Sequence, residues 1–581
     1  MKIVTHLFPK CSAWLRTPAG FCFGLSQIAF LVVLGLQIIG GLEPLELMAY
    51  DQGLRLLPDG PPDSRIVLIA ETEADLQRWG YPLPDAVLAD ALQRLQWAGA
   101  RAIGVDKFRD RMIPPGSESL AAATAPNVIW TMQFGAHVEN RIAPPPFLNS
   151  LDQVGFGDFP VDPDGITRRA LLFQDDGQTV YSSLALQLAL RYLQPLDIAP
   201  EPDSSNPRLL RLGSTTIPQF KATTGGYRHA DAAGYQYLLD FRGLTAPFAT
   251  YTLSELLDSQ VPETALRDRI VLIGAVAASL KDRLYIPTIG GATQDPAQRW
   301  AGADGISGVQ LHALAVSQLL RFALGEARPI RSLSEILEGI WIWLCCLAGG
   351  WLGYRAHSLR RFIVEISGVL IGLIGLTLAA LAVGWWLPLG AAALGLSSAA
   401  MLVTVQLRET VREQAVRDLL TGLLNRRYLD ETLPRELRRC QRNGEPLVAA
   451  MLDVDHFKRF NDSYGHEAGD AVLRALGELL RCSFRGSDLA CRYGGEELTV
   501  VMPGSSLNVA QVRLDELRQA VMQLRVLYQD NELPTITVSI GAAAAEPNET
   551  DAAALLGRAD AALYQAKAQG RNRVMVASSP A

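Results

Sequence analysis

The sequence contains little cysteine, and the long segment between residues 43 and 333 contains none. A segment without cysteine cannot form a disulfide, so we expect this part of the chain to be stabilised by packing alone. The cysteines that do occur lack the spacing of a zinc site, and core thiols are the better interpretation of them. The seven cysteines are Cys11, Cys22, Cys345, Cys346, Cys440, Cys482 and Cys491.

The chain also lacks an excess of basic residues. It has 53 Lys and Arg against 60 Asp and Glu, and the resulting net charge of −7 argues against a non-specific nucleic-acid binder. We therefore expect no nucleic-acid partner. At 581 residues the chain is too long for one hydrophobic core and should form two or more domains.

Hydrophobic residues make up 49% of the chain, a high share for a soluble protein of this length, and they are concentrated in four stretches. Each stretch is close to the ~20 residues that a helix needs to cross a bilayer. The sequence therefore predicts four transmembrane helices, at residues 23–42, 336–354, 362–383 and 386–406. The first follows a basic tail like that of a signal peptide, but no convincing cleavage pattern follows it, which favours an uncleaved anchor.

Lys and Arg indicate the orientation of these helices, since basic residues accumulate on the cytoplasmic side. They precede the first stretch, separate the second from the third and follow the fourth, whereas the turn at 384–386 is uncharged. Residues 1–22 and everything after 406 are therefore predicted in the cytoplasm, and residues 43–333 outside it. The basic residues are Lys2, Lys10, Arg16, Arg355, Arg360, Arg361, Arg408, Arg412 and Arg417.

The predicted exported region has the pattern of an α/β fold. Apolar runs at 65–70, 102–106 and 270–274 predict strands. An amphipathic helix is predicted at 85–99, and a second helix begins near Gly308. The order of strand, helix and strand indicates a parallel sheet.

Acidic residues stand where two of these strands end. Ligands of open α/β sheets bind at the carboxyl ends of strands, so Glu71, Asp106 and the loop after Gly274 are candidates for the lining of a pocket. Helix caps and solvated turns are at least as good an interpretation of these acids. The two alternatives stay open.

The exported region resembles the second type of CHASE sensor domain, an extracytoplasmic module of bacterial signalling proteins. The resemblance covers roughly residues 43–330, and in that family a sensor followed by three closely spaced helices is usual. It implies a multi-pass protein of the bacterial inner membrane with an unknown extracytoplasmic ligand or partner. The residues that carry it are Tyr50, Asp51 and Arg55, those at 65–70 and 79–84, Ile273 and Gly274, and those at 308–313.

A glycine-acid hairpin is the most informative feature of the C-terminal third. Apolar runs at 489–493 and 498–501 predict two strands joined through Gly494 and Gly495, with Glu496 beside the turn. A neighbouring strand at 447–452 ends at a second acid, Asp453. Two carboxylates that converge on one point suit Mg²⁺, which completes its coordination with water and phosphate oxygens.

These residues belong to a longer pattern that resembles the GGDEF domain, the catalytic domain of diguanylate cyclases. The resemblance implies a palm-like α/β fold of the nucleotidyl-cyclase type at 418–577, preceded by a signalling helix at 407–417. It also implies synthesis of cyclic di-GMP from two GTP, with release of two diphosphates, at a homodimer interface. Five segments match in order and spacing: residues 418–427, 453–462, 465–470, 492–498 and 558–572.

The resemblance assigns roles to individual residues. Asp453, Glu496 and the backbone carbonyl of Val454 would hold Mg²⁺, with Mn²⁺ as the alternative ion. Glu496 would also accept the proton, although a carboxylate on a cation is a weak base and the metal role is better supported. Lys458 would stabilise the transition state. The substrate-binding residues would be Asn461, His466, Asp470, Lys567 and Arg571, the last two one turn apart at the end of a helix at 552–569.

Arg485 and Asp488 have the spacing of the family's inhibitory product site, with a surface salt bridge as the alternative interpretation. Two residues depart from the commonest family pattern, Leu498 in place of Phe and Glu496 in place of Asp. Neither change removes a functional group. No role follows for Glu497.

The sequence thus predicts a sensor-regulated membrane diguanylate cyclase that acts as a homodimer, contacts lipid and is inhibited by its product. The alternative is a non-catalytic membrane receptor that binds cyclic di-GMP. Another nucleotide cyclase is disfavoured, because an amide at Asn461 and a carboxylate at Asp470 suit guanine better than adenine.

Overall fold

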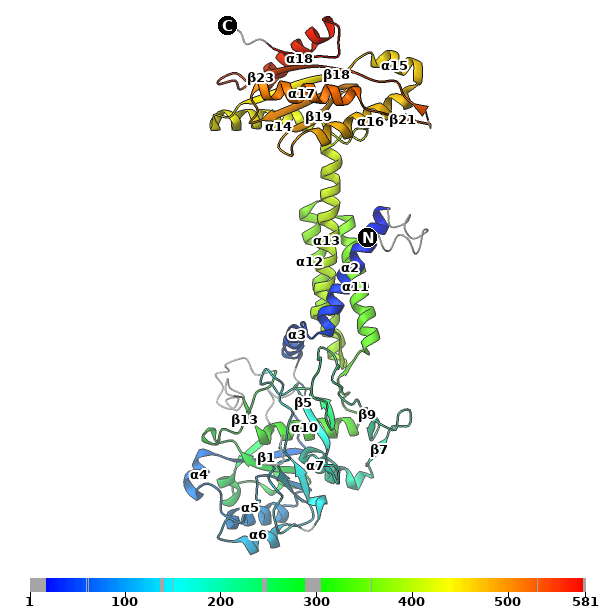
Figure 1. Ribbon diagram of the computed structural model, residues 1–581. Helices are drawn as coiled ribbons and strands as arrows, with labels where there is room; N and C mark the ends of the chain where they lie inside the picture. Colours follow the sequence, from blue (N-terminus) through cyan, green and yellow to red (C-terminus); the bar gives the residue numbers. More distant parts are fainter. Residues whose placement is uncertain are drawn as a thin grey trace. The chain divides into compact units, whose positions relative to one another are not determined.

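The computed structural model describes residues 17–58, 60, 62–135, 141–148, 150–242, 248–287, 305–356, 358–529 and 531–577, with the backbone alone at 18 and 410–415. It divides into two compact units, Met1–Thr404 and Val405–Ala581 (Figure 1). Most of the predicted N-terminal tail, with Lys2, Lys10, Cys11 and Arg16, lies outside the described residues, as does the side chain of Arg412.

The first unit contains a parallel sheet of six strands in the order β11-β1-β12-β2-β3-β4. Every neighbouring pair is parallel, which confirms the α/β prediction. β1 and β12 are completely buried, as expected of central strands covered on both faces. The strands are β1 (Ile66–Glu71), β2 (Ala102–Asp106), β3 (Val128–Met132), β4 (Val154–Phe156), β11 (Ala249–Thr252) and β12 (Ile270–Ala275).

Helices cover both faces of this sheet. One face packs on α5, α6 and α8, and the other on α7 and α10. α5 ends two residues earlier than predicted, because Gly99 has a positive φ that continues no helix. The helices are α4 (Glu73–Trp79), α5 (Asp85–Trp97), α6 (Ser117–Ala123), α7 (Leu184–Leu193), α8 (Leu253–Leu257), α9 (Glu263–Leu266) and α10 (Gly308–Ala323).

Smaller elements complete the domain. β10, β5 and β6 form one antiparallel sheet, and β7, β8 and β9 form another. Their bounds are β5 (Arg169–Asp175), β6 (Val180–Ser182), β7 (Pro200–Pro202), β8 (Leu210–Leu212), β9 (Thr215–Ile217), β10 (Tyr235–Leu238), β13 (Arg283–Leu284) and β14 (Ile306–Ser307). Short 3₁₀ turns lie at η3 (Leu151–Gln153), η4 (Gln194–Leu196) and η5 (Ala278–Leu280).

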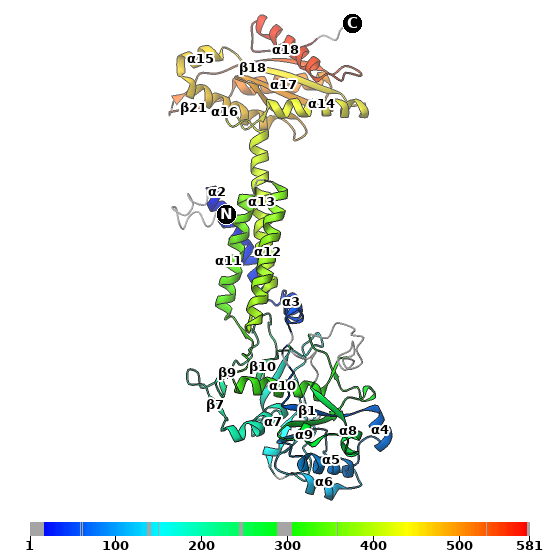
Figure 2. The same cartoon turned by 180° about the vertical axis from the view of Figure 1, so that it is seen from behind.

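Four helices of the described chain are long and apolar enough to cross a membrane. They are α2 (Pro18–Ile38), α11 (Glu335–Arg355), α12 (Leu359–Ala382) and α13 (Leu389–Val416), and they run side by side in both views (Figures 1 and 2). Small residues bring α11 and α13 into backbone contact, since a Cβ on Gly349 or Gly353 would collide with a carbonyl of α13. An additional helix that the sequence analysis did not predict, α3 (Glu43–Leu56), follows α2.

The fourth span begins later than predicted. Trp385–Trp386 form a short strand, β16, that pairs with Arg331–Ser332, β15, and the helix starts only at Leu389. Pro388 explains the difference, because a proline disfavours the helical conformation in the residue before it.

The second unit contains a six-stranded sheet in the order β17-β19-β20-β18-β23-β24. The four central strands are antiparallel to one another, and each edge strand, β17 and β24, is parallel to its one neighbour. The strands are β17 (Leu424–Asn425), β18 (Leu447–Val454), β19 (Leu489–Gly494), β20 (Glu497–Pro503), β23 (Val538–Ala544) and β24 (Val574–Val576), with a small hairpin of β21 (Leu527–Tyr528) and β22 (Asn531–Glu532) beside them.

Helices cover both faces here as well. α16 (His466–Ser483) and α17 (Leu507–Met522) pack on one face, and α14 (Arg426–Asn443) and α18 (Ala552–Ala568) on the other. α15 (Phe457–Tyr464) follows β18. Side chains of β18 alternate between the two cores, so that Leu452 faces α16 and α17 while Met451 and Asp453 share the side of α18.

Close approach of α18 to β23 holds this second face together. A Cβ on Gly541 of β23 would collide with the backbone of Ala559 and Leu563 in α18. Glycine is therefore required at this position by space. The contact also places the C-terminal end of α18 near the end of β18.

We expect Gly541→Ala to lower the free energy of unfolding of the isolated unit 405–581 by about 2 kcal/mol or more, because the added methyl overpacks a backbone contact. Urea unfolding followed by circular dichroism measures the change. Gly557→Ala is the control. That glycine lies within α18 with open space around it, and its replacement should stabilise the unit by about 0.5–1 kcal/mol. A Gly541→Ala protein as stable as the wild type would contradict the packing described.

Candidate active site

The predicted hairpin is present, and one arginine fastens its turn. Gly495 has a φ of +46°, which glycine adopts without strain. Arg492 donates from Nε and Nη2 to the Gly495 carbonyl, at 3.0 and 2.8 Å, and from Nη1 to Asp418 at 3.0 Å. β20 begins at Glu497, so Glu497 belongs to the sheet and Glu496 to the turn.

Asp453 lies inside the sheet, because β18 continues one residue past it. Its neighbours across the two adjacent strands are Glu497 and Ser539. The residue is 8% exposed, and its Oδ2 lies 2.8 Å from Nζ of Lys567, at the end of α18. Burial raises the pKa of Asp453; Lys567 opposes this shift and the charge of Glu496 adds to it.

The donor set at this point fits a hard divalent cation. Two carboxylates, Asp453 and Glu496, repel each other electrostatically, and the apolar Val454 has only main-chain groups to offer. Within the described ranges no group of three or more His, Cys, Asp and Glu could hold a metal ion. Mg²⁺ does not need such a cage, because waters and substrate phosphates complete its octahedron.

The predicted phosphate-binding residues come from two elements. Lys458 is exposed in the first turn of α15. Lys567 is in the last turn of α18, but Arg571 lies beyond the helix with a φ of +62°, so the predicted spacing of one helical turn is wrong. The helix ends at Ala568 because Gly570 has a φ of +113°.

A second acid, Asp455, fastens the segment that carries Arg571, a role that was not predicted from the sequence. Its carboxylate accepts hydrogen bonds from Thr537 Oγ1 at 2.7 Å, Ser539 Oγ at 2.6 Å and the Asn572 N–H at 3.1 Å. Asp455 is therefore a positioning residue. Its place two residues after Asp453 was the signal that could have identified it.

The predicted base and ribose residues lie on α15 and α16. Asn461 contacts Gly469 closely enough that a Cβ there would collide with Asn461 Oδ1. That oxygen is buried and has no hydrogen-bond partner among the described residues, as expected where a ligand supplies the partner. His466 begins α16 and is exposed, and Asp470 follows one turn later and is half-buried.

Arg485 and Asp488 do not form the simple surface salt bridge that was the alternative interpretation. Asp488 Oδ2 accepts the backbone N–H of Arg485 at 3.0 Å and pairs with Arg513 Nη2 of α17 at 2.7 Å. The carboxylate is buried, whereas Arg485 is exposed. Arg513 was not predicted, since only the tertiary fold brings α17 to this turn.

Glu497, which had no assigned role, borders a cavity of about 650 Å³ between α14 and α18. Burial raises its pKa, and the charges of Asp453 and Asp560 raise it further.

The predicted site residues of the described chain fall into three groups. Asp453, Glu496, Glu497 and Lys567 lie together; Asn461, His466 and Asp470 form a second group; and Arg485 and Asp488 form a third.

The fold and this site define a class: a chain that joins an α/β sensor unit and four apolar helices to a GGDEF-type nucleotide domain. The chain belongs to the CHASE2-domain family, whose model matches residues 28–351, more than half of its length. A second model, described as diguanylate cyclase, GGDEF domain, matches residues 415–573. Both resemblances noted in the sequence are confirmed.

Curated relatives match the C-terminal domain. Diguanylate cyclase DgcP of Pseudomonas aeruginosa is 44% identical over 169 residues, which are 29% of this chain and 25% of that protein. The response regulator PleD of Caulobacter vibrioides is 42% identical over 164 residues, 28% of this chain and 36% of that protein. The chain thus spans 25% to 36% of the length of these relatives.

Solved structures match the same domain. The GGDEF domain of DgcB from Caulobacter crescentus, in complex with c-di-GMP, is 38% identical. The match covers 28% of this chain and 94% of that chain, with a TM-score of 0.28.

Proposed function

We propose that the protein is a sensor-regulated membrane diguanylate cyclase, which joins two GTP into cyclic di-GMP and releases two diphosphates. One observation carries the proposal. At the end of β18, Asp453 and the hairpin acid Glu496 interact beside Lys567, in a domain that is 44% identical to part of a diguanylate cyclase.

Each half of the reaction is the attack of a ribose 3′-hydroxyl on the α-phosphorus of another GTP. A divalent cation, Mg²⁺ or Mn²⁺, would be held by Asp453, the Val454 carbonyl and Glu496, and would neutralise the triphosphate and polarise the α-phosphate. Glu496 accepts the hydroxyl proton, because it stands in the turn, outside the paired strands. Glu497 is held within the sheet opposite Asp453 and does not take this role.

The cations bind the phosphate chain. Lys567 forms its ion pair with Asp453 at 2.8 Å, and an incoming phosphate would compete for the same ammonium. Lys567 and Arg571 bind the terminal phosphate oxygens, Arg571 from the segment after α18, and Lys458 approaches the phosphate chain from the first turn of α15. Lys458 also stabilises the charge that develops during transfer.

Asn461 and Asp470 recognise guanine, and His466 contacts the ribose. Guanine presents N1–H and N2–H donors to a carboxylate, whereas adenine has no such pair. The unpaired, buried Oδ1 of Asn461 supports this assignment. One domain holds one GTP, so the active form is a homodimer with the two sites facing each other.

Control by the sensor unit is supported by a buried carboxylate at the start of α13. Glu46 of α3 is 1% exposed and accepts the N–H groups of Leu389 at 3.0 Å and Ala391 at 2.6 Å. It therefore caps the helix that continues to Val416 and precedes the GGDEF domain. Burial raises the pKa of Glu46, opposed by these backbone N–H groups.

An aromatic cluster connects the same helix start to the sensor core. Trp386 is 3% exposed, and its ring centroid lies 4.3 Å from that of Tyr50 and 5.9 Å from that of Tyr227. The Tyr227 hydroxyl donates to Asp162, which pairs with the buried Arg168 at 2.7 Å. A change in the sensor core can thus reach α13 through packed, hydrogen-bonded groups.

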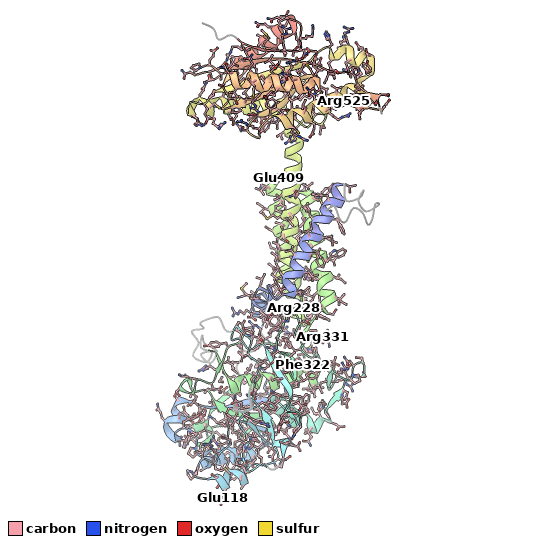
Figure 3. The ribbon with its side chains drawn as sticks, viewed as in Figure 1. Glu118, Arg228, Phe322, Arg331, Glu409 and Arg525 are labelled. Atoms are coloured by element: carbon pink, nitrogen blue, oxygen red, sulfur yellow. The ribbon has the colours of Figure 1, made fainter. Side chains whose placement is uncertain are left out.

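A parallel connection reaches α11. Arg228, labelled in Figure 3, pairs with Glu338 at 2.9 Å and donates its backbone N–H to Glu43 of α3 at 2.9 Å.

We place the protein in the bacterial inner membrane, in contact with lipid. By the distribution of its basic residues, 43–333 lie outside the cytoplasm and the GGDEF domain within it. The sensed extracytoplasmic ligand or partner regulates the cyclase through α13.

The first test is Glu496→Ala in the full chain, assayed for cyclic di-GMP formation from GTP and Mg²⁺. We expect the rate to fall by about 10²- to 10⁴-fold, because a base and a metal ligand are removed together. Glu478→Ala, at an exposed acid of α16, should keep the wild-type rate. Near-normal turnover by Glu496→Ala would refute the site. A wild type that binds cyclic di-GMP without turnover would establish the receptor alternative.

Product inhibition is proposed at Arg485, with Arg513 and Asp488 beside it. We expect Arg485→Ala to raise the cyclic di-GMP concentration for half-inhibition about 10-fold or more, since an arginine–phosphate contact is lost. The initial rate should not change, because the exposed guanidinium supports no described contact of the fold. Arg525→Ala, an exposed arginine labelled in Figure 3, is the control. Unchanged inhibition of Arg485→Ala would place the product elsewhere.

Removal of the cap tests regulation. We expect the basal cyclase rate of full-length Glu46→Ala in liposomes to become that of the isolated residues 405–581. Without the Glu46 cap, the sensor unit no longer controls the start of α13. Met48→Ala, an exposed residue of the same helix, should keep the wild-type rate. A Glu46→Ala rate equal to that of the wild type, where wild type and fragment differ, would exclude this route.

A further inference from the structure

The sensor domain contains a cavity of about 850 Å³ at the carboxyl ends of its central strands. Asp106 ends β2 at this place, and Ala275 ends β12. Gly308 and His312 border it from the first turns of α10, and Phe159 from the loop after β4. This is the position where open α/β sheets bind their ligands.

Two carboxylates in this cavity, Asp106 and Asp282, form no ion pair with a Lys or Arg side chain of the described residues. The side chain of Asp106 is 12% exposed and accepts no hydrogen bond from the described residues. A Cβ added to Gly308 would lie 3.1 Å from Asp282 Oδ2 and 3.5 Å from Asp106 Oδ2, so both acids face one point above α10. The charge of Asp106 also raises the pKa of Asp282, after the larger effect of burial.

The buried basic residues beside the cavity already have partners. Lys107 forms an ion pair with the fully buried Glu71. Arg109 lies 3.4 Å from Asp85 and donates to the Leu83 carbonyl at 2.8 Å. Burial raises the pKa of Asp282, whereas Lys107 and the Gly308 N–H lower it. No Lys or Arg of the described residues pairs directly with either carboxylate, so a cation that enters the cavity could contact both acids.

His312 supplies a third acceptor. Its side chain is 4% exposed, and Nε2 lies 3.9 Å from Asp106 Oδ1. Burial lowers the pKa of His312 to about 4, so the imidazole is neutral near pH 7 and presents an unprotonated nitrogen. Its Nδ1 is buried with no hydrogen-bond partner among the described residues.

We propose that this cavity binds a small organic cation that carries a primary ammonium group. The three N–H donors of an ammonium match Asp106, Asp282 and the unprotonated nitrogen of His312. Phe159, whose ring centroid lies 4.8 Å from that of His312, and Phe108 provide an aromatic wall for the carbon part of the ligand. A divalent metal fits less well, since the described part of the chain offers no three-residue metal group.

Calorimetric titration of the full chain in detergent tests the proposal with phenethylamine and putrescine as probes. We expect at least one amine to bind, and 2-phenylethanol, which has the same ring but no charge, to give no heat. Asp106→Asn and Asp282→Asn should each weaken amine binding about 10-fold or more, because a charged acceptor is lost. Asp90→Asn, at a half-exposed acid of α5 outside the cavity, should bind as the wild type does.

Gly308→Ala keeps all charges and adds one methyl group between the two carboxylates, so it should also weaken binding even if an Asp variant does not fold. Four results would overturn the proposal. The first is that 2-phenylethanol binds as well as the amines, and the second is that no variant changes amine binding. The third is that Mn²⁺ or Zn²⁺ binds while amines do not. The fourth is that neither amine gives heat at about 10 mM, a concentration that would nearly saturate a site with a Kd of ~1 mM. The readout is binding, so it does not depend on the cyclase activity.

Discussion

The arrangement of the C-terminal unit around its site depends on one carboxylate that is buried inside the sheet. Asp453 costs free energy at this position unless cations approach it, and Lys567 does so from the end of α18 at 2.8 Å. The helix reaches that point only because Gly541 lets it pack on β23 backbone to backbone. Asp455 then fastens the segment after the helix. In the proposed reaction, a metal and a triphosphate would replace this one ion pair with a larger set of charges.

The first unit shows what happens when buried charges are balanced and when they are not. Arg168 binds Asp51, Asp162 and Asp164, and Glu46 binds the first N–H groups of α13; these groups are satisfied and make rigid connections. Asp106 and Asp282 form no ion pair with an Arg or Lys within the described chain, although Asp282 accepts the Gly308 N–H. The contrast distinguishes the connecting network from the cavity in which we propose amine binding.

Prediction from sequence succeeded where one local pattern decides the outcome. Long apolar runs identified β1, β2, β12 and β18, and the Gly-Gly-Glu-Glu hairpin was found from glycine and acid alone. It failed at points decided by distant residues. α3 was not predicted, because its buried face depends on contacts with the sensor, α12 and α13. The ion pair of Asp488 with Arg513 joins a turn to a helix further along the chain, and no spacing in the sequence predicts it.

The sequence by itself determined the order of domains, four apolar helices and the set of acids and cations at the hairpin, since composition and periodicity are local properties. The tertiary structure decided which of these groups meet. It placed Arg571 outside its helix, Glu497 opposite Asp453, and Glu46 at the start of α13. It also brought Asp106 and Asp282 together at one cavity beside His312. Such facts depend on burial and on contacts between residues far apart in the chain, and neither is a property of any short segment.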